Sequence, residues 1–195
     1  DLAYTGLAQT PSPVVKDDTT VLTKDTDYEL SYSSNTNVGT ATITITGKGN
    51  YSGTRDVSFD ITPVALTITA ADNGKEYGEA DPVLTVSYSS FVNGEDQDDL
   101  TGTLSVDRAT GESIGTYPIT ASGLSATNYA ITYASGTFTI NSKPITNAAI
   151  TVGSITDLAY TGLAQTPSPV VKDDTTVLTK DTDYELSYSS NTNVG

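Results

Sequence analysis

Four carboxylates within the segment Glu95-Asp96-Gln97-Asp98-Asp99 are the residues of this 195-residue chain that most clearly suggest chemistry. Ca²⁺ is bound by about six to eight oxygen ligands, many of them carboxylates. Glu95, Asp96, Asp98 and Asp99 are therefore candidate calcium ligands, within this segment or between neighbouring modules. The alternative is a solvated acidic loop, since the sequence has neither an EF-hand loop nor a glycine-rich nonapeptide repeat.

The common catalytic centres are not compatible with this composition. The chain has no His and no Cys, so it cannot build a Ser-His-Asp triad or the usual zinc sites. Paired carboxylates can cleave glycosides, and Glu76 with Glu79, or Asp96 with Asp98, are candidate pairs. Both pairs lie in turn-rich sequence, without a Trp to stack on a sugar ring. We interpret them as solvated and predict that the chain is not an enzyme and has no cofactor other than calcium.

Tyrosine is the dominant aromatic residue, with twelve Tyr against three Phe. Most Tyr residues fall near the ends of expected strands. A tyrosine ring commonly packs at the edge of a core while its hydroxyl finds a hydrogen-bond partner. We predict that role here, with carbohydrate stacking or contact between fibres as the alternative.

The organisation of the chain follows from an internal repeat. Residues 157–195 reproduce residues 1–39 letter for letter, at an offset of 156 residues. Such identity indicates recent tandem duplication, so we expect a longer natural molecule in which this period recurs.

Apolar and polar residues alternate with a period of two in many short segments, and clusters of Gly, Asn, Asp and Pro separate them. Alternate side chains of a strand face opposite sides of a sheet, so the Ile, Val, Leu and Phe residues would line a core. The pattern predicts an all-β fold of antiparallel β-sandwiches. The expected strands cover 42–46, 57–61, 66–69, 84–88, 131–133 and 138–140.

The sequence divides the chain into three modules. Module 1 is residues 1–62 and lacks a first strand equivalent to 142–156. Module 2 is residues 63–141, with an acidic insertion around 92–112. Module 3, residues 142–195, is the front part of a second copy of module 1. Similar motifs recur in modules 1 and 2, such as Phe59-Asp60-Ile61 and Phe138-Thr139-Ile140, so the array alternates two divergent types of sandwich.

Motifs in both module types resemble known families. Module 2 resembles the MBG domain of the type marked by a Tyr-Gly pair. The motifs are Lys75-Glu76-Tyr77-Gly78-Glu79-Ala80-Asp81-Pro82, Gly115-Thr116-Tyr117-Pro118-Ile119 and Asn128-Tyr129-Ala130-Ile131. Module 1 is similar to bacterial Ig-like repeats of large surface proteins, through Tyr4-Thr5-Gly6, Asp27-Tyr28, Asn37-Val38-Gly39-Thr40 and Gly47-Lys48-Gly49-Asn50-Tyr51-Ser52-Gly53. The resemblance implies tandem Ig-like sandwiches in a linear array, on the outside of a bacterial cell.

A covalent crosslink is a further alternative, because comparable bacterial modules form isopeptide bonds between Lys and Asn or Asp. We interpret the lysines of this chain as turn or linker residues rather than core residues, which argues against the crosslink. These lysines are Lys16, Lys24, Lys48, Lys75 and Lys143.

Charge and linkers complete the functional prediction. The net charge of −15 argues against nucleic acid and anionic membranes as partners, and no apolar run is long enough to cross a bilayer. Short linkers with Pro63 and Pro144 leave little room for bending. We predict the structural shaft of an extracellular adhesin or matrix filament, whose main partners are neighbouring repeats of the same chain. The alternatives are a repeated binding module for glycans or other filaments, acting by avidity, and a laterally self-assembling surface fibre.

Overall fold

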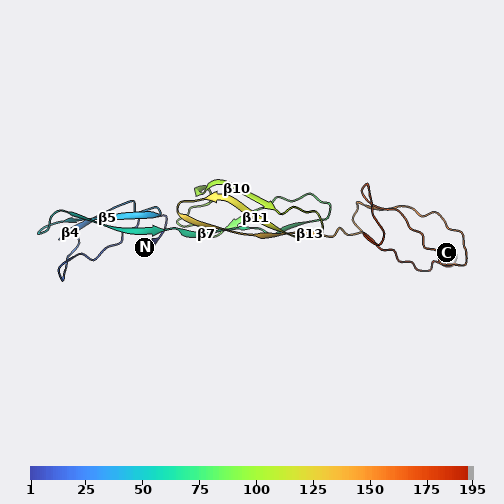
Figure 1. Ribbon diagram of the computed structural model, residues 1–195, viewed down its shortest axis with the longest axis horizontal. Coiled ribbons are helices and arrows are strands. Elements are labelled where there is room, and N and C mark those ends of the chain that lie inside the picture. Colours follow the sequence, from blue (N-terminus) through green and yellow to red (C-terminus); the bar gives the residue numbers. More distant parts are fainter. Residues whose placement is uncertain (193–195) are drawn as a thin grey trace. The chain divides into compact units, whose positions relative to one another are not determined.

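The computed structural model describes residues 1–192, which form strands, turns and irregular segments and one short 3₁₀ helix, η1, Gln97–Asp99 (Figure 1). The predicted all-β class is therefore confirmed. The described chain forms two compact units. The first contains Asp1–Lys75 and Glu79–Ile140, and the second contains Glu76–Gly78 and the residues from Asn141 onward.

Module 1 is built on a four-stranded sheet with the order β1-β6-β5-β4. These strands are β1 (Leu2–Ala3), β4 (Tyr28–Ser33), β5 (Gly39–Gly47) and β6 (Thr54–Thr62). The alternation of Thr and Ile along β5 fits a strand that buries one face, and Ala41 and Ile43 of β5 are indeed buried. A small hairpin of β2 (Lys16–Asp17) and β3 (Thr20–Val21) lies outside this sheet.

Module 2 contains two sheets. One has the order β10-β11-β13-β8 and the other β12-β7-β9. Ala70 of β7 shares a buried cluster with Ile119, Phe138 and Ile140 of β11 and β13, so one apolar core joins the two sheets. The strands are β7 (Val64–Ala70), β8 (Asn73–Glu76), β9 (Val86–Tyr88), β10 (Thr101–Arg108), β11 (Gly115–Ser125), β12 (Tyr129–Ala134) and β13 (Gly136–Asn141).

Two features differ from the sequence-based expectation. The expected antiparallel pairing was wrong for two pairs, because β1 runs parallel to β6 and β12 runs parallel to β7. Both parallel pairs join strands that are distant in sequence, a relation that alternation within one segment does not encode. In addition, the acidic insertion around 92–112 contains β10, which pairs with β11 from Thr101 to Arg108.

The second unit contains β14 (Ile150–Val152), β15 (Val171–Asp173) and β16 (Thr176–Val177), which form one antiparallel sheet. Residues 157–192 have the same sequence as 1–36 but form fewer strands. The counterparts of β1 and β4, around 158–159 and 184–189, are not strands. Residues 142–192 contain no counterpart of β5 or β6. The segments around 158–159 and 184–189 therefore lack the strands with which β1 and β4 pair in module 1.

Candidate functional site: the junction between modules 1 and 2

Modules 1 and 2 meet through an almost uninterrupted backbone. β6 ends at Thr62 and β7 begins at Val64, so Pro63 alone separates the two strands. The amide of Val64 donates a hydrogen bond to the carbonyl of Asn128, at 3.1 Å. Proline fixes φ and restricts the residue before it to extended conformations. The connection therefore has little freedom to swivel.

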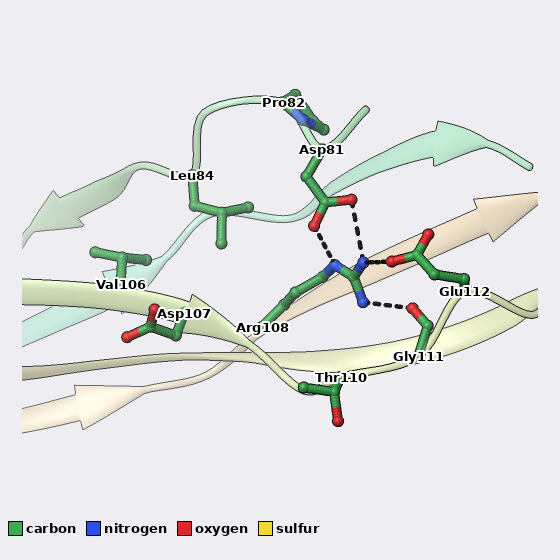
Figure 2. Close-up of a pocket in the computed structure, with 9 residues that line it drawn as sticks. All are labelled: Asp81, Pro82, Leu84, Val106, Asp107, Arg108, Thr110, Gly111 and Glu112. Carbon is green, nitrogen blue, oxygen red and sulfur yellow. Dashed lines mark hydrogen bonds and ion pairs between the residues drawn. The ribbon is translucent and has the colours of Figure 1, made fainter. Parts of the chain in front are cut away.

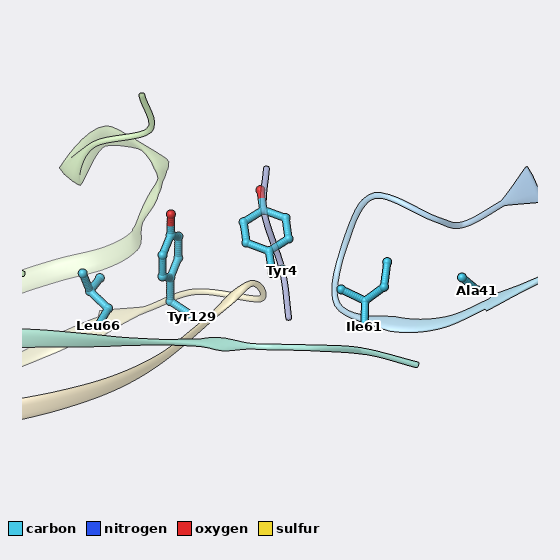
Figure 3. Packing of buried hydrophobic residues seen from close by; sticks show 5 residues of the cluster. All are labelled: Tyr4, Ala41, Ile61, Leu66 and Tyr129. Carbon is cyan, nitrogen blue, oxygen red and sulfur yellow. The ribbon is translucent and has the colours of Figure 1, made fainter. Parts of the chain in front are cut away.

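A buried cluster spans the junction (Figure 3). Tyr4, Ala41 and Ile61 come from module 1, while Leu66 and Tyr129 come from module 2. Tyr4 lies between Ile61 and Tyr129 in Figure 3, and its ring meets that of Tyr129 edge to face, with centroids 5.9 Å apart. All five residues are at most 5% exposed. Removal of this apolar surface from water favours close contact between the modules.

The backbone around Tyr4 explains how a residue near the start of module 1 reaches module 2. Leu2 and Ala3 pair in parallel with Ile61 and Thr62, at the end of β6. The amide of Tyr4 continues the pairing by donating to the carbonyl of Thr62, at 2.9 Å. The segment is thus guided along the last strand of its own module, directly to the first residues of the next.

The Glu95 carboxylate joins the two buried tyrosines of this cluster. The Tyr4 hydroxyl donates to Glu95 Oε1, and the Tyr129 hydroxyl donates to Glu95 Oε2 at 2.5 Å. The Tyr129 oxygen also accepts a hydrogen bond from the Val92 amide, at 3.1 Å. Hydrogen bonds to an ionised group are stronger than those between neutral groups. We call this arrangement the Tyr-Glu-Tyr bridge: Tyr4 from module 1, with Glu95 and Tyr129 from module 2.

The carboxylate raises the pKa of both hydroxyl groups in the bridge. The hydrogen bond to Glu95, together with burial, raises the pKa of Tyr4 to about 12. Burial and the same carboxylate raise the pKa of Tyr129. Each phenol must stay protonated to donate its hydrogen bond, and a neighbouring negative charge opposes its ionisation. The bridge is therefore stable in its protonated form at neutral pH.

Two asparagines of module 2 make further polar contacts with module 1. The Asn128 side chain accepts a hydrogen bond from the Val38 amide, at 3.0 Å, and donates to Asn37 Oδ1, at 3.2 Å. Asn93 donates to the carbonyl of Gly6, at 3.3 Å. These contacts hold the modules together at points outside the buried cluster.

Gly6 is required at its position for two reasons. Its φ is +75°, a conformation that residues with a Cβ rarely adopt. A Cβ built on Gly6 would also lie 2.7 Å from the Cβ of Asn93. The Tyr4-Thr5-Gly6 motif therefore combines a buried ring with a backbone position that permits close approach of module 2.

The four candidate calcium ligands do not converge on one point. Both oxygens of Glu95 accept hydrogen bonds from tyrosines. Asp96 and Asp99 cap η1, where Asp96 Oδ1 accepts from the Asp98 amide and Asp99 Oδ2 accepts from the Asp96 amide, at 2.8 and 2.9 Å. Asp98 is exposed. Within residues 1–192 no group of three or more acidic side chains is arranged to hold a metal ion. Calcium binding and a metal-free acidic loop both stay predictions for these four residues, and the Tm with and without calcium distinguishes them.

A second charged cluster lies in module 2, beside a hollow of about 330 Å³ (Figure 2). Arg108 contacts Asp81 through Nε and Nη2, at 2.5 and 3.1 Å, and contacts Glu112 at 2.5 Å. Its guanidinium carbon lies 4.8 Å from the centre of the Phe138 ring. Lys75 reaches the same two carboxylates, at 2.6 and 2.5 Å. The two positive charges are thus matched by two negative ones.

Lys75 corrects one sequence-based expectation. We interpreted it as a turn or linker residue, but it lies in β8 and its side chain is only 5% exposed. Formation of an amide would require a neutral Lys75 amine and a protonated Asp81. The hydrogen bonds to Asp81 and Glu112 raise the pKa of Lys75, and the Arg108 guanidinium lowers the pKa of Asp81 to about 2. Both groups are held in their charged forms, which favours an ion pair over an isopeptide bond.

The Tyr-Gly pair of module 2 follows β8, and Tyr77 donates from its amide to the carbonyl of Asn141, at 2.8 Å. Gly78 has a φ of +85°, the conformation that glycine adopts most readily. Residues 66–139 match the MBG domain (YGX type). This confirms the resemblance of module 2, and MBG domains are non-catalytic repeat modules of bacterial surface proteins. No curated protein and no solved structure matches the chain significantly.

Module 2, whose residues 66–139 match the MBG domain, thus supplies one side of the junction through Glu95, Asn128 and Tyr129, and the Phe91 ring packs against Tyr129 with centroids 5.5 Å apart. The predicted role of tyrosine as a core-edge residue is confirmed for Tyr4 and Tyr129, which are 4% and 5% exposed and donate from their hydroxyls. The bridge itself was not predicted, because nothing in the local sequence pairs Glu95 with tyrosines 91 and 34 residues away.

Proposed function

We propose that this chain is part of the structural shaft of a long extracellular bacterial adhesin or matrix filament. In this proposal Ig-like sandwiches repeat along the chain with the 156-residue period, and the shaft gives reach and resistance to pulling. The MBG domain supports a surface-protein repeat. In the part of the chain that the structure describes, no helix is long and apolar enough to span a membrane.

The junction between modules 1 and 2 is the observation that carries this proposal. A shaft needs neighbouring modules whose relative orientation is fixed, because free swivelling at each linker would collapse the array into a coil. Here the modules share a buried cluster, the Tyr-Glu-Tyr bridge and a linker of one proline. Interfaces between domains of one chain are often mobile unless they are well packed, so this degree of packing favours a mechanical role.

A distance measurement across the junction tests the proposal. The absence of Cys allows spin labels to be attached at two introduced cysteines, Ser31→Cys in β4 and Ser122→Cys in β11, both at exposed positions. We expect a single narrow distance distribution by pulsed electron paramagnetic resonance. Tyr4→Ala should broaden it, because the ring and the hydroxyl group that link the modules are lost.

Tyr160→Ala is the matched control. Tyr160 occupies the position of Tyr4 in the second copy of the same sequence, but it is 65% exposed, so its removal should leave the distribution unchanged. A broad distribution in the unmodified chain would contradict a shaft. Specific binding on a glycan array by an otherwise flexible chain would favour the repeated binding module instead.

A further inference from the structure

Asn-Gly pairs are points at which the backbone of a protein reacts with its own side chain. The amide nitrogen of the Gly attacks the side-chain carbonyl carbon of the preceding Asn, because glycine has no side chain to hinder the approach. The new N–C bond closes a succinimide ring, and the Asn side-chain nitrogen leaves as ammonia with the amide proton. Water then opens the ring and leaves an aspartate or an isoaspartate. This chain has two such pairs, Asn73-Gly74 and Asn93-Gly94.

The first pair, Asn73-Gly74, is held within a sheet of module 2. Both residues belong to β8, which pairs with β13. The Asn73 side chain donates to the carbonyl of Val83, at 3.1 Å, and a Cβ built on Gly74 would lie 2.5 Å from the Thr139 carbonyl oxygen. The backbone at Asn73 must rotate before the ring closes, and this close packing opposes the rotation. The structure therefore protects this pair.

The second pair, Asn93-Gly94, lies in an exposed turn. Its φ angles of +51° and +78° fit the central residues of a type I′ turn, for which Asn-Gly is a preferred sequence. The turn is closed by the Glu95 amide, which donates to the Val92 carbonyl at 3.0 Å. Within residues 1–192 the Gly94 amide makes no hydrogen bond, and a Cβ built on Gly94 would meet only open space. The attacking nitrogen of this pair is therefore accessible.

Contacts at the junction between modules 1 and 2 restrain this turn. The Val92 amide donates to the Tyr129 hydroxyl, and the Glu95 carboxylate accepts from both tyrosines of the Tyr-Glu-Tyr bridge. The bridge thus fixes the residues on both sides of the Asn-Gly pair. The Asn93 side chain itself donates to the Gly6 carbonyl, at 3.3 Å, and its Cβ packs directly against Gly6. The turn is held mainly by the contact with module 1 and by the bridge.

We propose that Asn93-Gly94 is a deamidation site whose rate is set by the junction between modules 1 and 2. Opening of the junction, by heat or by pulling, releases the turn and lets the backbone at Asn93 rotate into the reactive conformation. The reaction is irreversible, and it replaces the donor that faces the Gly6 carbonyl with a carboxylate. Two acceptors form no hydrogen bond with each other, and an isoaspartate also lengthens the backbone of the turn, so the product opposes closure of the junction. Each opening thus increases the chance of a permanent weakening.

Peptide mapping by mass spectrometry, on the whole chain incubated at mildly alkaline pH, tests this proposal. Trypsin cleaves after Lys and Arg, so Asn73 lies in peptide 56–75 and Asn93 in peptide 76–108, each without another Asn. Deamidation increases the peptide mass by the exchange of NH₂ for OH. The rate for each peptide is divided by its rate in the chain unfolded in urea, which removes the effect of neighbouring sequence. We expect this ratio to be higher for the peptide with Asn93.

Tyr4→Ala removes the module 1 side of the bridge and tests control by the junction. The rate at Asn93 should rise at least about fivefold, because loss of one net hydrogen bond changes the population of the opened state by about that factor. The rate at Asn73 should not change, which separates release of the turn from unfolding of module 2. Tyr4→Phe keeps the ring and should give a smaller rise at Asn93 alone. Tyr160→Ala is the matched control and should leave both rates unchanged, since Tyr160 is 65% exposed.

The effect of the product is measured on the same samples. Anion exchange separates the deamidated fraction by its additional negative charge, and its Tm should be lower than that of the unreacted fraction. Asn93→Asp should lower the Tm in the same direction.

Three results would overturn the proposal: equal ratios for the two peptides, no acceleration confined to Asn93 in Tyr4→Ala and Tyr4→Phe, or the same Tm for both fractions. None of them would contradict the proposed shaft, which is tested by the distance between labels 31 and 122 in chains that have not reacted.

Discussion

At the scale of single residues, the Tyr-Glu-Tyr bridge shows how context determines the role of a side chain. Tyr4 and Tyr160 have identical neighbours in sequence, yet Tyr4 is 4% exposed and Tyr160 is 65% exposed. The difference arises from Glu95 and Tyr129, which the MBG domain places against Tyr4. A phenol is suited to this position because its ring packs in the cluster while its hydroxyl satisfies a half-buried carboxylate.

Removal of one hydroxyl should reveal its contribution. Tyr4→Phe keeps the ring but leaves Glu95 Oε1 without this donor, which should lower the free energy of unfolding by about 1–3 kcal/mol. Tyr160→Phe should change it by less than about 0.5 kcal/mol, as expected for an exposed position. Urea unfolding followed by circular dichroism measures both. Equal effects of the two substitutions would mean that the bridge contributes nothing to stability.

Alkaline pH should weaken the bridge. The pKa of Tyr4 is raised to about 12 in the folded chain, against about 10 for an unfolded tyrosine. A raised pKa favours the protonated folded state, so this contribution to stability is complete below about pH 10 and is lost as the pH rises through about 12. Urea unfolding at intervals of pH from 9 upward measures the loss.

Glu95→Gln provides the control for the alkaline transition. The neutral amide removes the negative charge that opposes ionisation, so the pKa of Tyr4 should fall toward about 10. In a pH titration followed by tyrosinate absorbance, the Glu95→Gln variant should then have one fewer tyrosine with a raised pKa than the unmodified chain. If the late titration persists in Glu95→Gln, burial rather than the carboxylate accounts for the raised pKa.

The hydrogen bonds of the acidic segment give a separate prediction about calcium. Because both Glu95 oxygens are hydrogen-bonded and Asp96 and Asp99 cap η1, we expect millimolar calcium or chelator to leave the Tm unchanged. A ligand that binds only the folded state raises stability by RT ln(1 + [L]/Kd). A rise in Tm that Asp96→Asn and Asp98→Asn abolish would establish the calcium site instead.

At the scale of elements, the path of residues 1–7 depends on the backbone conformation at Gly6. Gly6→Ala places a Cβ at a φ of +75° and 2.7 Å from Asn93. Gly162→Ala introduces a Cβ at a φ of +74°, where the nearest contact is Tyr160 Oη at 3.8 Å. The conformational cost is thus shared, and only Gly6→Ala adds a clash. We expect Gly6→Ala to destabilise by at least about 1 kcal/mol more, measured by thermal unfolding.

The sequence predicted strands better than it predicted their partners. Alternating residues such as Thr42-Ile43-Thr44 identify β5 because period two is a local property. The parallel pairs β1–β6 and β12–β7 depend on contacts between distant residues, and so does the position of Glu95 between two tyrosines. The acidic segment was identified as a candidate calcium site, but charge density alone could not show that both oxygens of Glu95 accept hydrogen bonds from tyrosines. Lys75 was misplaced because its partners, Asp81 and Glu112, lie in separate loops.

At the scale of the whole molecule, the chain combines a net charge of −15 with close contacts between modules 1 and 2. In the proposed shaft, like charges on neighbouring copies would repel one another and oppose lateral aggregation. The tight contacts are confined to the ends of modules, where Asn128 and Glu95 meet module 1.

The parallel pairing of β1 with β6 has a thermodynamic consequence. Leu2 and Ala3 pair with the last residues of β6, while Tyr4 and Gly6 contact Glu95 and Asn93 of module 2. The MBG domain therefore cannot melt without exposing the Tyr4 ring, and module 1 cannot melt without removing that ring from its neighbour. When neighbouring modules of a chain interact strongly, they unfold together in one transition instead of separately. Calorimetry should show residues 1–141 unfolding as a single cooperative block, so heat or force would be resisted by pairs of modules rather than by each module alone.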